Sequence, residues 1–227
     1  MASGGHRTFS FKVVLLGEGR VGKTSVILRY CENKFYDKHI STLQASFFNK
    51  KLNIAGNRVN LSIWDTAGQE RFHALGPIYY RESNGAVLLY DITDSDSFQK
   101  VKLWVKELRR ILGNEVCLCI VGNKTDLDKD RNVSAEEAER YAEAVGAQHH
   151  QTSAKLNTGI DQLFLSLCKL ALFSDCSAGM MDAVVLEERS RANNLPYSGH
   201  SHHHSLQIVD SEQEETTAPR GSCCFSA

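Results

Sequence analysis

Hydrophobic residues fall in blocks along the chain, and three of these blocks are short and nearly unbroken: FKVVLL (11–16), GAVLLYDI (85–92) and VCLCIVG (116–122). Strands of a parallel sheet show this pattern because helices cover both faces of such a sheet. Residues 58–64, RVNLSIW, alternate instead, and they follow the turn-forming residues AGN and another strand-like run. This second pattern predicts a β-hairpin.

Helical patterns separate the strands. Apolar residues recur at spacings of three and four in two segments, as one buried face of a helix requires. The two sets are Phe98, Val101, Val105, Leu108 and Leu112, and Ile160, Leu163, Phe164, Leu167 and Ala171. Ser134 followed by Glu137 forms a capping box that predicts a third helix through about Val145. Because strands alternate with helices, we expect a layered α/β domain with a mainly parallel sheet over residues 10–172.

Composition divides the chain at about residue 172. The formal net charge is −1, but residues 173–227 hold three arginines, no lysine and eight acidic residues, so the first 172 residues carry +4. The small overall charge argues against nucleic acid as a partner. Two of the three prolines also lie after residue 172, where the periodicity fades. We therefore expect residues 173–227 to form a disordered, hypervariable tail.

The N-terminus and the cysteines indicate a cytosolic protein. Residues 1–9 lack the apolar core of a secretory signal and predict a flexible extension, and no apolar stretch approaches the roughly 20 residues that cross a bilayer. Seven cysteines, an odd number, fit reduced thiols better than disulfides, and Cys117 and Cys119 fit a strand core better than a metal site. The three histidines at 202–204 could bind a metal, although a solvated loop is the favoured interpretation.

The sequence GEGRVGKTS begins directly after the first apolar strand and matches the pattern G-x-x-x-x-G-K-[ST] from Gly17 to Thr24. Glycines let the backbone curl so that its N–H groups converge on phosphate oxygens. Lys23 then supplies a charge to the outer phosphates, and the hydroxyl of Thr24 is offered to Mg²⁺ at the start of the next helix. This context of strand, loop and helix makes a simple glycine turn a poor explanation.

Three further stretches separate GTPases from the kinases and ATPases that share a phosphate loop. WDTAGQE ends the alternating strand with Asp65, which can hold magnesium through water, and places Gln69 where its amide could orient a nucleophilic water. NKTD places Asn123, Lys124 and Asp126 at the carboxyl end of another strand, where open α/β sheets bind ligands. A carboxylate there can accept hydrogen bonds from the ring N–H and the exocyclic amine of guanine. TSAK, after the next strand, fits a loop that caps the base.

Together these motifs resemble those of the Ras superfamily of small GTPases, from Phe11 to about Leu172. WDTAGQERF, YY at 79–80 and LLYDIT are typical of the Rab family, and YCENKF, STLQASF and FHALGPIYYR are similar to its early-endosomal subgroup. The resemblance implies a P-loop NTPase small G domain, with a mainly parallel six-stranded sheet, one antiparallel strand and helices on both faces. The chain departs from many Rabs at LQ after Thr42, where an Ile-Gly pair is common, and at Gln151, where Glu is common.

The resemblance also implies roles for individual residues. The expected phosphate-binding set is Gly17, Gly19, Arg20, Val21, Gly22, Lys23, Thr24, Ser25 and Gly68. The expected guanine-binding set is Phe35, Asn123, Lys124, Asp126, Ser153, Ala154 and Lys155. Magnesium is expected on Thr24, Thr42 and Asp65, and the expected effector surface is Phe47, Trp64 and Tyr79. Gln69 is the expected catalytic residue.

These roles imply a switch that binds GTP or GDP together with Mg²⁺. The γ-phosphate would hold Thr42 and the backbone near Gly68, ordering two segments, approximately 36–46 and 66–80, that relax after hydrolysis. No internal residue is an evident arginine finger, since Arg20 fits a surface role better, so hydrolysis should be slow without an activating partner. The alternative is a nucleotide-locked scaffold at membranes. A metabolic nucleotide kinase is weaker because no segment predicts an acceptor-binding domain.

The partners that the resemblance implies are an exchange factor, a GTPase-activating protein, a GDP-dissociation inhibitor, the Rab escort protein with its geranylgeranyl transferase, and effectors, all acting on a monomer. Cys223 and Cys224 would each carry a geranylgeranyl group, although CFSA read alone suggests one farnesyl group. A single lipid attaches reversibly, and Glu212, Glu214 and Glu215 would be repelled by an anionic leaflet. We expect two lipids and residence on the cytoplasmic face of early endosomes, with a cytosolic inhibitor-bound pool.

Overall fold

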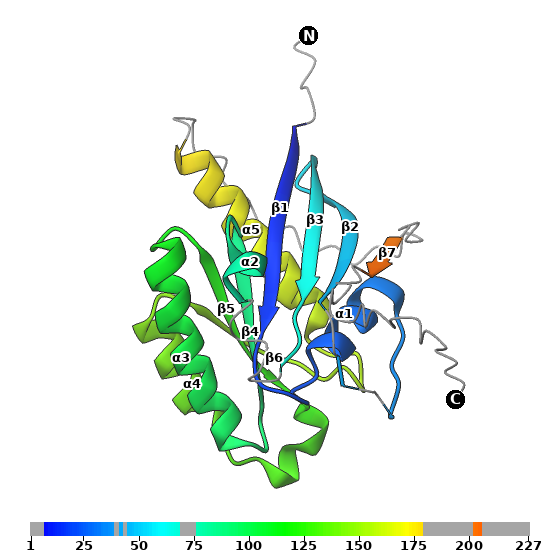
Figure 1. The fold of residues 1–227 in the computed structure, drawn as a ribbon, viewed down its shortest axis with the longest axis vertical. Helices are drawn as coiled ribbons and strands as arrows, with labels where there is room; N and C mark the ends of the chain where they lie inside the picture. The colour runs from blue at the N-terminus through cyan, green and yellow to red at the C-terminus, as the bar shows by residue number, and fades with distance from the viewer. Residues whose placement is uncertain (1–6, 39–40, 43–44, 69–75, 179–201, 206–227) are drawn as a thin grey trace, which may run out of the picture.

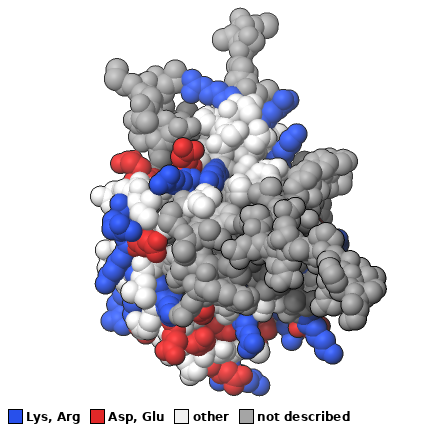
Figure 2. Space-filling view, viewed as in Figure 1, with Lys and Arg blue, Asp and Glu red and all other residues white. Residues whose placement is uncertain are grey.

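The computed structural model of the chain describes residues 7–38, 41–42, 45–68, 76–178 and 202–205. In this part of the chain, strands and helices alternate and build one sheet that is covered by helices on both faces (Figure 1). None of the helices described here combines the length and the apolar character that crossing a membrane requires. Acidic and basic side chains lie side by side along the left and lower parts of the surface seen in Figure 2.

The elements begin and end close to the positions that the hydrophobic pattern predicts. The strands are β1 (Thr8–Leu16), β2 (Ser46–Ile54), β3 (Asn57–Asp65), β4 (Gly85–Asp91), β5 (Cys117–Asn123), β6 (Gln148–Gln151) and β7 (His202–Ser205). The helices are α1 (Lys23–Glu32), α2 (Gly76–Tyr80), α3 (Ser95–Leu112), the 3₁₀ helix η2 (Thr125–Asp130), α4 (Ala135–Ala144) and α5 (Ile160–Ala178).

The sheet has the strand order β6-β5-β4-β1-β3-β2-β7. Strands β3, β1, β4, β5 and β6 run parallel, whereas β2 pairs antiparallel with β3 in the predicted hairpin. The predicted sheet of five parallel strands and one antiparallel strand is therefore confirmed. The structure adds a further antiparallel strand, β7, on the outer edge of β2.

The pleat of β1 divides the hydrophobic core between the two faces of the sheet. Val13 and Leu15 pack in a cluster with residues of α1 and α5, while Val14 and Leu16 pack in a second cluster with residues of α3 and α4. All four side chains are buried. The apolar residues of this central strand do not alternate with polar ones, because helices cover both of its faces.

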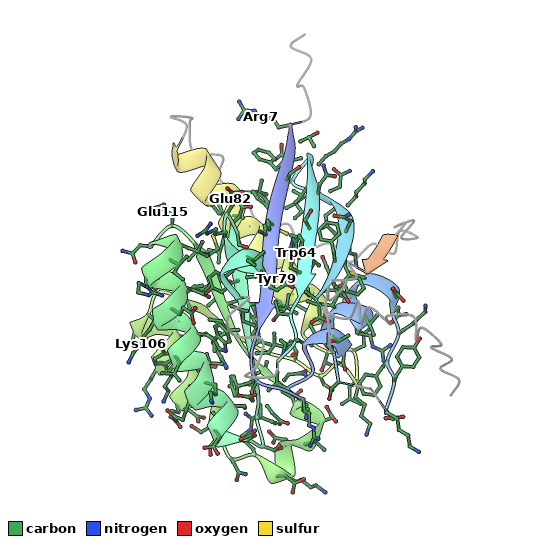
Figure 3. The ribbon with its side chains drawn as sticks, viewed as in Figure 1. Arg7, Trp64, Tyr79, Glu82, Lys106 and Glu115 are labelled. Atoms are coloured by element: carbon green, nitrogen blue, oxygen red, sulfur yellow. The ribbon has the colours of Figure 1, made fainter. Side chains whose placement is uncertain are left out.

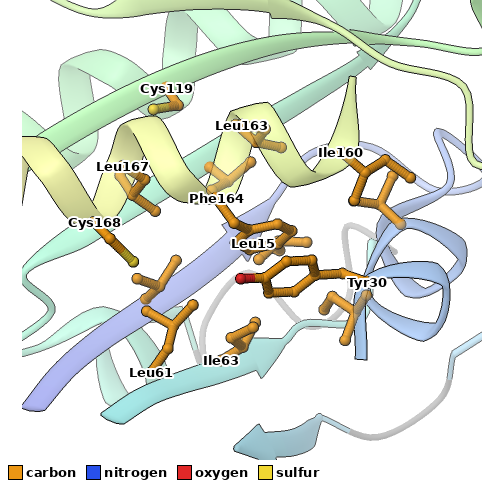
Figure 4. Close-up of a cluster of buried hydrophobic side chains, with 14 of the residues drawn as sticks. Leu15, Tyr30, Leu61, Ile63, Cys119, Ile160, Leu163, Phe164, Leu167 and Cys168 are labelled. Carbon is orange, nitrogen blue, oxygen red and sulfur yellow. The ribbon is translucent and has the colours of Figure 1, made fainter. Parts of the chain in front are cut away.

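An aromatic pair joins the first and last helices of the domain. The ring of Tyr30 in α1 stacks on the ring of Phe164 in α5, with their centroids 3.9 Å apart (Figure 4). Both side chains are buried in the same cluster as Leu15 and Leu163. This stacking holds α1 against α5, the last helix of the domain.

The cysteines of the strands are core residues, as the sequence indicates. Cys117 and Cys119 are buried in β5, and Cys168 is buried opposite them in α5. Burial raises the pKa of the Cys119 and Cys168 thiols to about 12. These thiols stay protonated at neutral pH and behave as small apolar side chains.

Two helices begin at side-chain caps. The hydroxyl of Ser134 accepts a hydrogen bond from the backbone N–H of Glu137 at 3.1 Å, which confirms the predicted start of α4. The carboxylate of Asp94 accepts from the N–H groups of Asp96 and Ser97 at the start of α3. The caps satisfy N–H groups that the first turn of a helix leaves without a partner.

The structure differs from the sequence prediction at three boundaries. Strand β1 begins at Thr8, inside the predicted extension, because Phe9 packs partly against the core. Helix α5 continues to Ala178, six residues past the predicted limit at 172. Residues His202–Ser205, in the segment predicted to be disordered, pair with β2 as β7.

The stacked pair in the core leads to a prediction about stability. Phe164→Ala should lower the free energy of unfolding by about 3–5 kcal/mol, because it removes a buried ring and leaves a cavity beneath Tyr30. Phe173→Ala is the matched control, since this ring lies on the same helix and is 54% exposed, and its effect should stay within about 0.5 kcal/mol. Urea unfolding at a fixed excess of nucleotide measures both variants. Equal losses would contradict the packing described here.

Candidate nucleotide-binding site

The loop between β1 and α1 depends on two glycines. Gly17 and Gly22 have φ angles of 146° and 96°, in the region that L side chains rarely adopt. A Cβ at Gly17 would clash with the carbonyl oxygen of Leu89, and a Cβ at Gly22 would lie 2.5 Å from the side-chain nitrogen of Asn123. Gly22 also provides no side-chain cap for α1. The first N–H groups of this helix are therefore free of a side-chain cap and can bind an anion.

Lys23 fills the centre of this loop. Its ammonium donates to the carbonyl oxygens of Gly17 at 2.8 Å and Glu18 at 2.9 Å, and the residue is buried. Burial lowers the pKa of Lys23 to about 8, although Asp65 and Glu18 favour its charged form. The ammonium remains charged at neutral pH, and it is held by the loop that the sequence predicts to bind phosphate.

Three side-chain oxygens from separate elements meet beside Lys23. The hydroxyl of Thr24 donates to the carboxylate of Asp65 at 2.5 Å and lies 2.7 Å from the hydroxyl of Thr42. The second carboxylate oxygen of Asp65 is buried and has no hydrogen-bond partner among the described residues. Burial raises the pKa of Asp65 to about 6, against the hydrogen bond from Thr24 and the charge of Lys23. A buried, under-satisfied carboxylate beside two hydroxyls is a donor set that suits Mg²⁺.

The predicted base-binding residues lie at the carboxyl ends of β5 and β6, except for Phe35, which follows α1. Asn123 is buried, and its side-chain amide donates to the carbonyl oxygen of Val21 at 2.8 Å while its oxygen accepts from the hydroxyl of Thr152 at 3.1 Å. The hydroxyl of Ser153 donates to the carboxylate of Asp126 at 2.5 Å. These bonds fix both loops relative to the glycine loop.

Lys124 has a different partner from its neighbours. Its ammonium pairs with the carboxylate of Asp91 at 2.5 Å, and its backbone adopts a left-handed conformation with φ 68°. This conformation turns the chain from β5 into η2, so that Asp126 faces the cleft and not the strand below. The ion pair ties the base-binding loop to the end of β4.

One cleft connects these groups. Most of the predicted site residues line it: Gly19, Arg20, Gly22, Lys23, Thr24, Ser25, Phe35, Thr42, Gly68, Asn123, Lys124, Asp126, Ala154 and Lys155. The other predicted residues of the phosphate, guanine and magnesium sets stand behind the cleft wall and support it: Gly17, Val21, Asp65 and Ser153. The structure therefore brings together the two motif groups that are more than a hundred residues apart in the sequence.

Two supporting residues belong to none of the predicted sets. Arg29 in α1 donates from Nε to the carbonyl oxygen of Ala154 at 2.9 Å, and its guanidinium lies 5.8 Å from the ring centroid of Phe35. Thr152 is buried and positions Asn123. Arg29 belongs to no motif that would have indicated its role. Thr152 is the first residue of the TSAK motif, so the sequence could have placed it in the guanine-binding set.

The predicted aromatic surface forms a continuous row beside the cleft. Trp64 of β3 lies between Phe47 of β2, with ring centroids 5.1 Å apart, and Tyr79 of α2, with centroids 5.9 Å apart. Figure 3 labels Trp64 and Tyr79 close to each other, and their rings are tilted by 46°. Ile78, the neighbour of Tyr79, is 67% exposed. An exposed apolar group next to partly buried rings is typical of a protein-binding surface.

Several predicted residues lie outside the described part of the chain. They are Gln69, Cys223 and Cys224, together with the two residues, Leu43 and Gln44, that depart from the common Rab pattern. The segments approximately 36–46 and 66–80 are described only in part. The catalytic and lipidation assignments therefore stay predictions.

Comparison with known proteins identifies the family. A model described as the Ras family matches residues 12–172. The chain belongs to the Ras family. Ras-related protein Rab-21 of Homo sapiens is 64% identical over 220 residues, which cover 97% of this chain and 93% of that protein. Rab-21 of Dictyostelium discoideum is 63% identical over 160 residues, which cover 70% of this chain and 76% of that protein. Ras-related protein RHN1 of Nicotiana plumbaginifolia is 42% identical over 169 residues, which cover 74% of this chain and 84% of that protein.

These similarities place the chain in the Rab branch of the Ras family and confirm the resemblance inferred from its motifs. It is a Rab small GTPase that binds guanine nucleotide, hydrolyses GTP and acts in vesicle trafficking with regulators and effectors. The cleft is the place where the geometry fits that nucleotide. Nothing in the comparisons supports a nucleotide-locked scaffold.

The buried contact between Thr152 and Asn123 gives a second prediction. Thr152→Val keeps the shape of the side chain but leaves the Asn123 oxygen without its donor, so GDP affinity should fall by about 5- to 150-fold, the equivalent of about 1–3 kcal/mol. Thr158→Val, an exposed threonine of the same loop, is the control and should bind like the wild type. Fluorescent-nucleotide titration measures both. Wild-type affinity in folded Thr152→Val would show that Asn123 needs no support.

Proposed function

We propose that this Rab-type GTPase is a magnesium-dependent switch whose two states are read at the aromatic surface of Phe47, Trp64 and Tyr79. The observation that carries the proposal is the meeting of the Thr24, Asp65 and Thr42 oxygens in the cleft. When bound, Mg²⁺ would neutralise charge on the phosphate oxygens. Thr24 and Thr42 would hold the ion directly, and Asp65 would hold it through water.

Phosphate binding couples to the two switch segments through residues that lie beside the cation site. The loop N–H groups and Lys23 would bind the outer phosphates, with Gly68 facing Lys23 across the cleft, because a Cβ on Gly68 would clash with the Lys23 ammonium. A γ-phosphate would thus hold Thr42 from one segment and Gly68 from the other. Hydrolysis removes both contacts, and the aromatic surface that joins these segments relaxes.

Asp126 would select guanine over adenine. Its carboxylate lines the cleft and is oriented by Ser153, so it can accept from the ring N–H and the exocyclic amine of guanine. Phe35, held by Arg29, would stack on the base, and Lys124, Ala154 and Lys155 would enclose it. Adenine does not present those two donors together, so it would leave the carboxylate poorly paired.

Hydrolysis itself would depend on Gln69, which we assign to orienting the attacking water. No arginine finger is evident within the chain, so a GTPase-activating protein would accelerate the reaction by roughly 10³–10⁵-fold, a range taken from the related Ras and Gα proteins. Arg20 lines the cleft, but a surface role fits it better than catalysis.

Membrane attachment would come from geranylgeranyl groups on Cys223 and Cys224, added by the transferase with the Rab escort protein. The acidic residues that precede them disfavour an anionic leaflet, so one lipid would hold the protein only weakly. The motifs that resemble those of early-endosomal Rabs support an endosomal site of action for this chain. An exchange factor and a GDP-dissociation inhibitor would move the protein between membrane and cytosol.

The guanine assignment predicts a change of base preference. Asp126→Asn exchanges a double acceptor for an amide, so preference should move by at least about 100-fold from GDP toward XDP. Asp128→Asn is the matched control, because this carboxylate pairs with Arg131 on the surface, and it should keep guanine selectivity. Competition binding with both nucleotides measures the ratio. A folded Asp126→Asn protein with unchanged selectivity would refute the assignment.

The catalytic assignment predicts slower hydrolysis without loss of binding. Gln69→Leu keeps most of the volume but removes the amide, so the single-turnover rate should fall by up to about 100-fold while GTP affinity changes little. Gln99→Leu, an exposed glutamine in α3, should hydrolyse GTP at the wild-type rate. Equal rates for the two variants, with and without an activating partner, would exclude the role of Gln69.

Lipidation can be tested on full-length protein in cells. Cys223→Ser or Cys224→Ser alone should weaken and misdirect membrane residence, because a single prenyl chain attaches reversibly. The double change should leave a cytosolic protein that still binds GTP. Mass spectrometry of the membrane-bound wild type should find two prenyl groups. A single group, or a double variant that stays on endosomes, would be inconsistent with this attachment.

A further inference from the structure

The outer edge of β2 is already paired with another part of the chain. Residues Ser46–Asn49 form an antiparallel ladder with His202–Ser205, in a register that sets Phe47 opposite His204 and Phe48 opposite His203 (Figure 1). The segment comes from the tail and begins 148 residues after the end of β2 in the sequence. This contact is not part of the nucleotide cleft, and the function described above does not use it.

The half of β2 that pairs with β7 carries no charged side chain that would discourage pairing with other strands. Ser46–Asn49 contains two phenylalanines and no charge, whereas Lys50 and Lys51 follow immediately and the ladder stops before them. Exposed sheet edges attract other strands because their N–H and C=O groups have no partner, and lysines on an edge discourage such pairing. Within the described part of the chain, the ladder with β7 thus covers the uncharged half of this edge and does not extend to the half that begins with Lys50.

The covered half is also the half nearest to the predicted switch. Ser46 lies four residues after Thr42, and Phe47 belongs to the aromatic surface through its contact with Trp64. A strand on this edge therefore lies beside the place where effectors are proposed to bind. Any partner that extends the sheet at Ser46–Asn49 must first displace the tail.

We propose that His202–Ser205 is an intramolecular strap that occupies a strand-binding edge of β2 and so competes with partners that would add an extended strand beside the effector surface. The competition with partners rests on the function proposed above, whereas the strap itself does not. Four residues make few hydrogen bonds, but 23 residues connect them to the end of α5 at Ala178. A tether of this kind gives an effective concentration of about a millimolar, at which a weak contact is populated.

The strap can be broken without touching the cleft or β2. Successive N–H groups of a strand point to opposite sides, so of two neighbouring residues one donates toward β2. His203→Pro with His204→Pro therefore removes that donor whichever residue supplies it, and proline is tolerated poorly in a ladder. A matched control with two prolines in the same tail, Ser211→Pro with Glu212→Pro, leaves residues 202–205 intact.

Amide hydrogen exchange of the full-length, GDP-bound protein tests the strap directly. We expect the amides of Ser46–Asn49 that face β7 to exchange at least about tenfold faster in the strap variant than in the wild type and in the control. Amides of β3, which has strands on both sides, should not change. Unchanged exchange at Ser46–Asn49 would overturn the strap, and because the assay needs neither hydrolysis nor an effector, that result would leave the proposed switch untouched.

A synthetic peptide of residues 200–207, HSHHHSLQ, serves as the competing strand. At millimolar concentration it should shift the β2 amide resonances of the strap variant in a saturable way, and it should shift those of the wild type and the control at least several-fold less. Equal shifts in all three proteins, or none in the strap variant, would show that the edge is not a site for which strands compete.

Discussion

The amide of Asn123 is the contact on which the nucleotide site depends. It is buried, it donates to Val21 in the glycine loop and it accepts from Thr152 in the loop after β6. The phosphate half and the base half of the cleft come from segments about a hundred residues apart, and this side chain bonds to both of them. A nucleotide must reach both halves at once, so an error in the spacing between the halves would affect both ends of the ligand.

The fold itself places two opposite charges at the cleft. Lys23 and Asp65 are both buried. Burial lowers the pKa of the lysine and raises the pKa of the carboxyl, so it favours the neutral form of each group. Water has thus been removed from both groups as part of folding. A phosphate beside the lysine and a cation beside the carboxylate would restore the favourable surroundings that water no longer provides.

The sequence allowed the strands, the amphipathic helices and most of the cleft to be predicted, because these depend on local patterns. The apolar run of β1 needs only helices above and below it, and the NKTD residues follow β5 directly. Arg29 could not be predicted in the same way, since its partner Ala154 lies 125 residues away and the bond exists only because α1 packs beside that loop. Strand β7 was also missed, because edge pairing uses backbone groups and HHHS has no alternating apolar pattern.

The buried thiols have a practical consequence for work with this protein. Cys117, Cys119 and Cys168 lie within the core, and Cys31, only partly buried, has its pKa raised to about 12 as well. Alkylating dyes and mild oxidants attack the thiolate, which Cys31, Cys119 and Cys168 do not form at neutral pH because burial raises their pKa values to about 12. Labelling at Cys117, Cys119 or Cys168, which are buried, therefore requires the fold to open, and the rate of modification at these three positions reports how often the sheet and its helices separate.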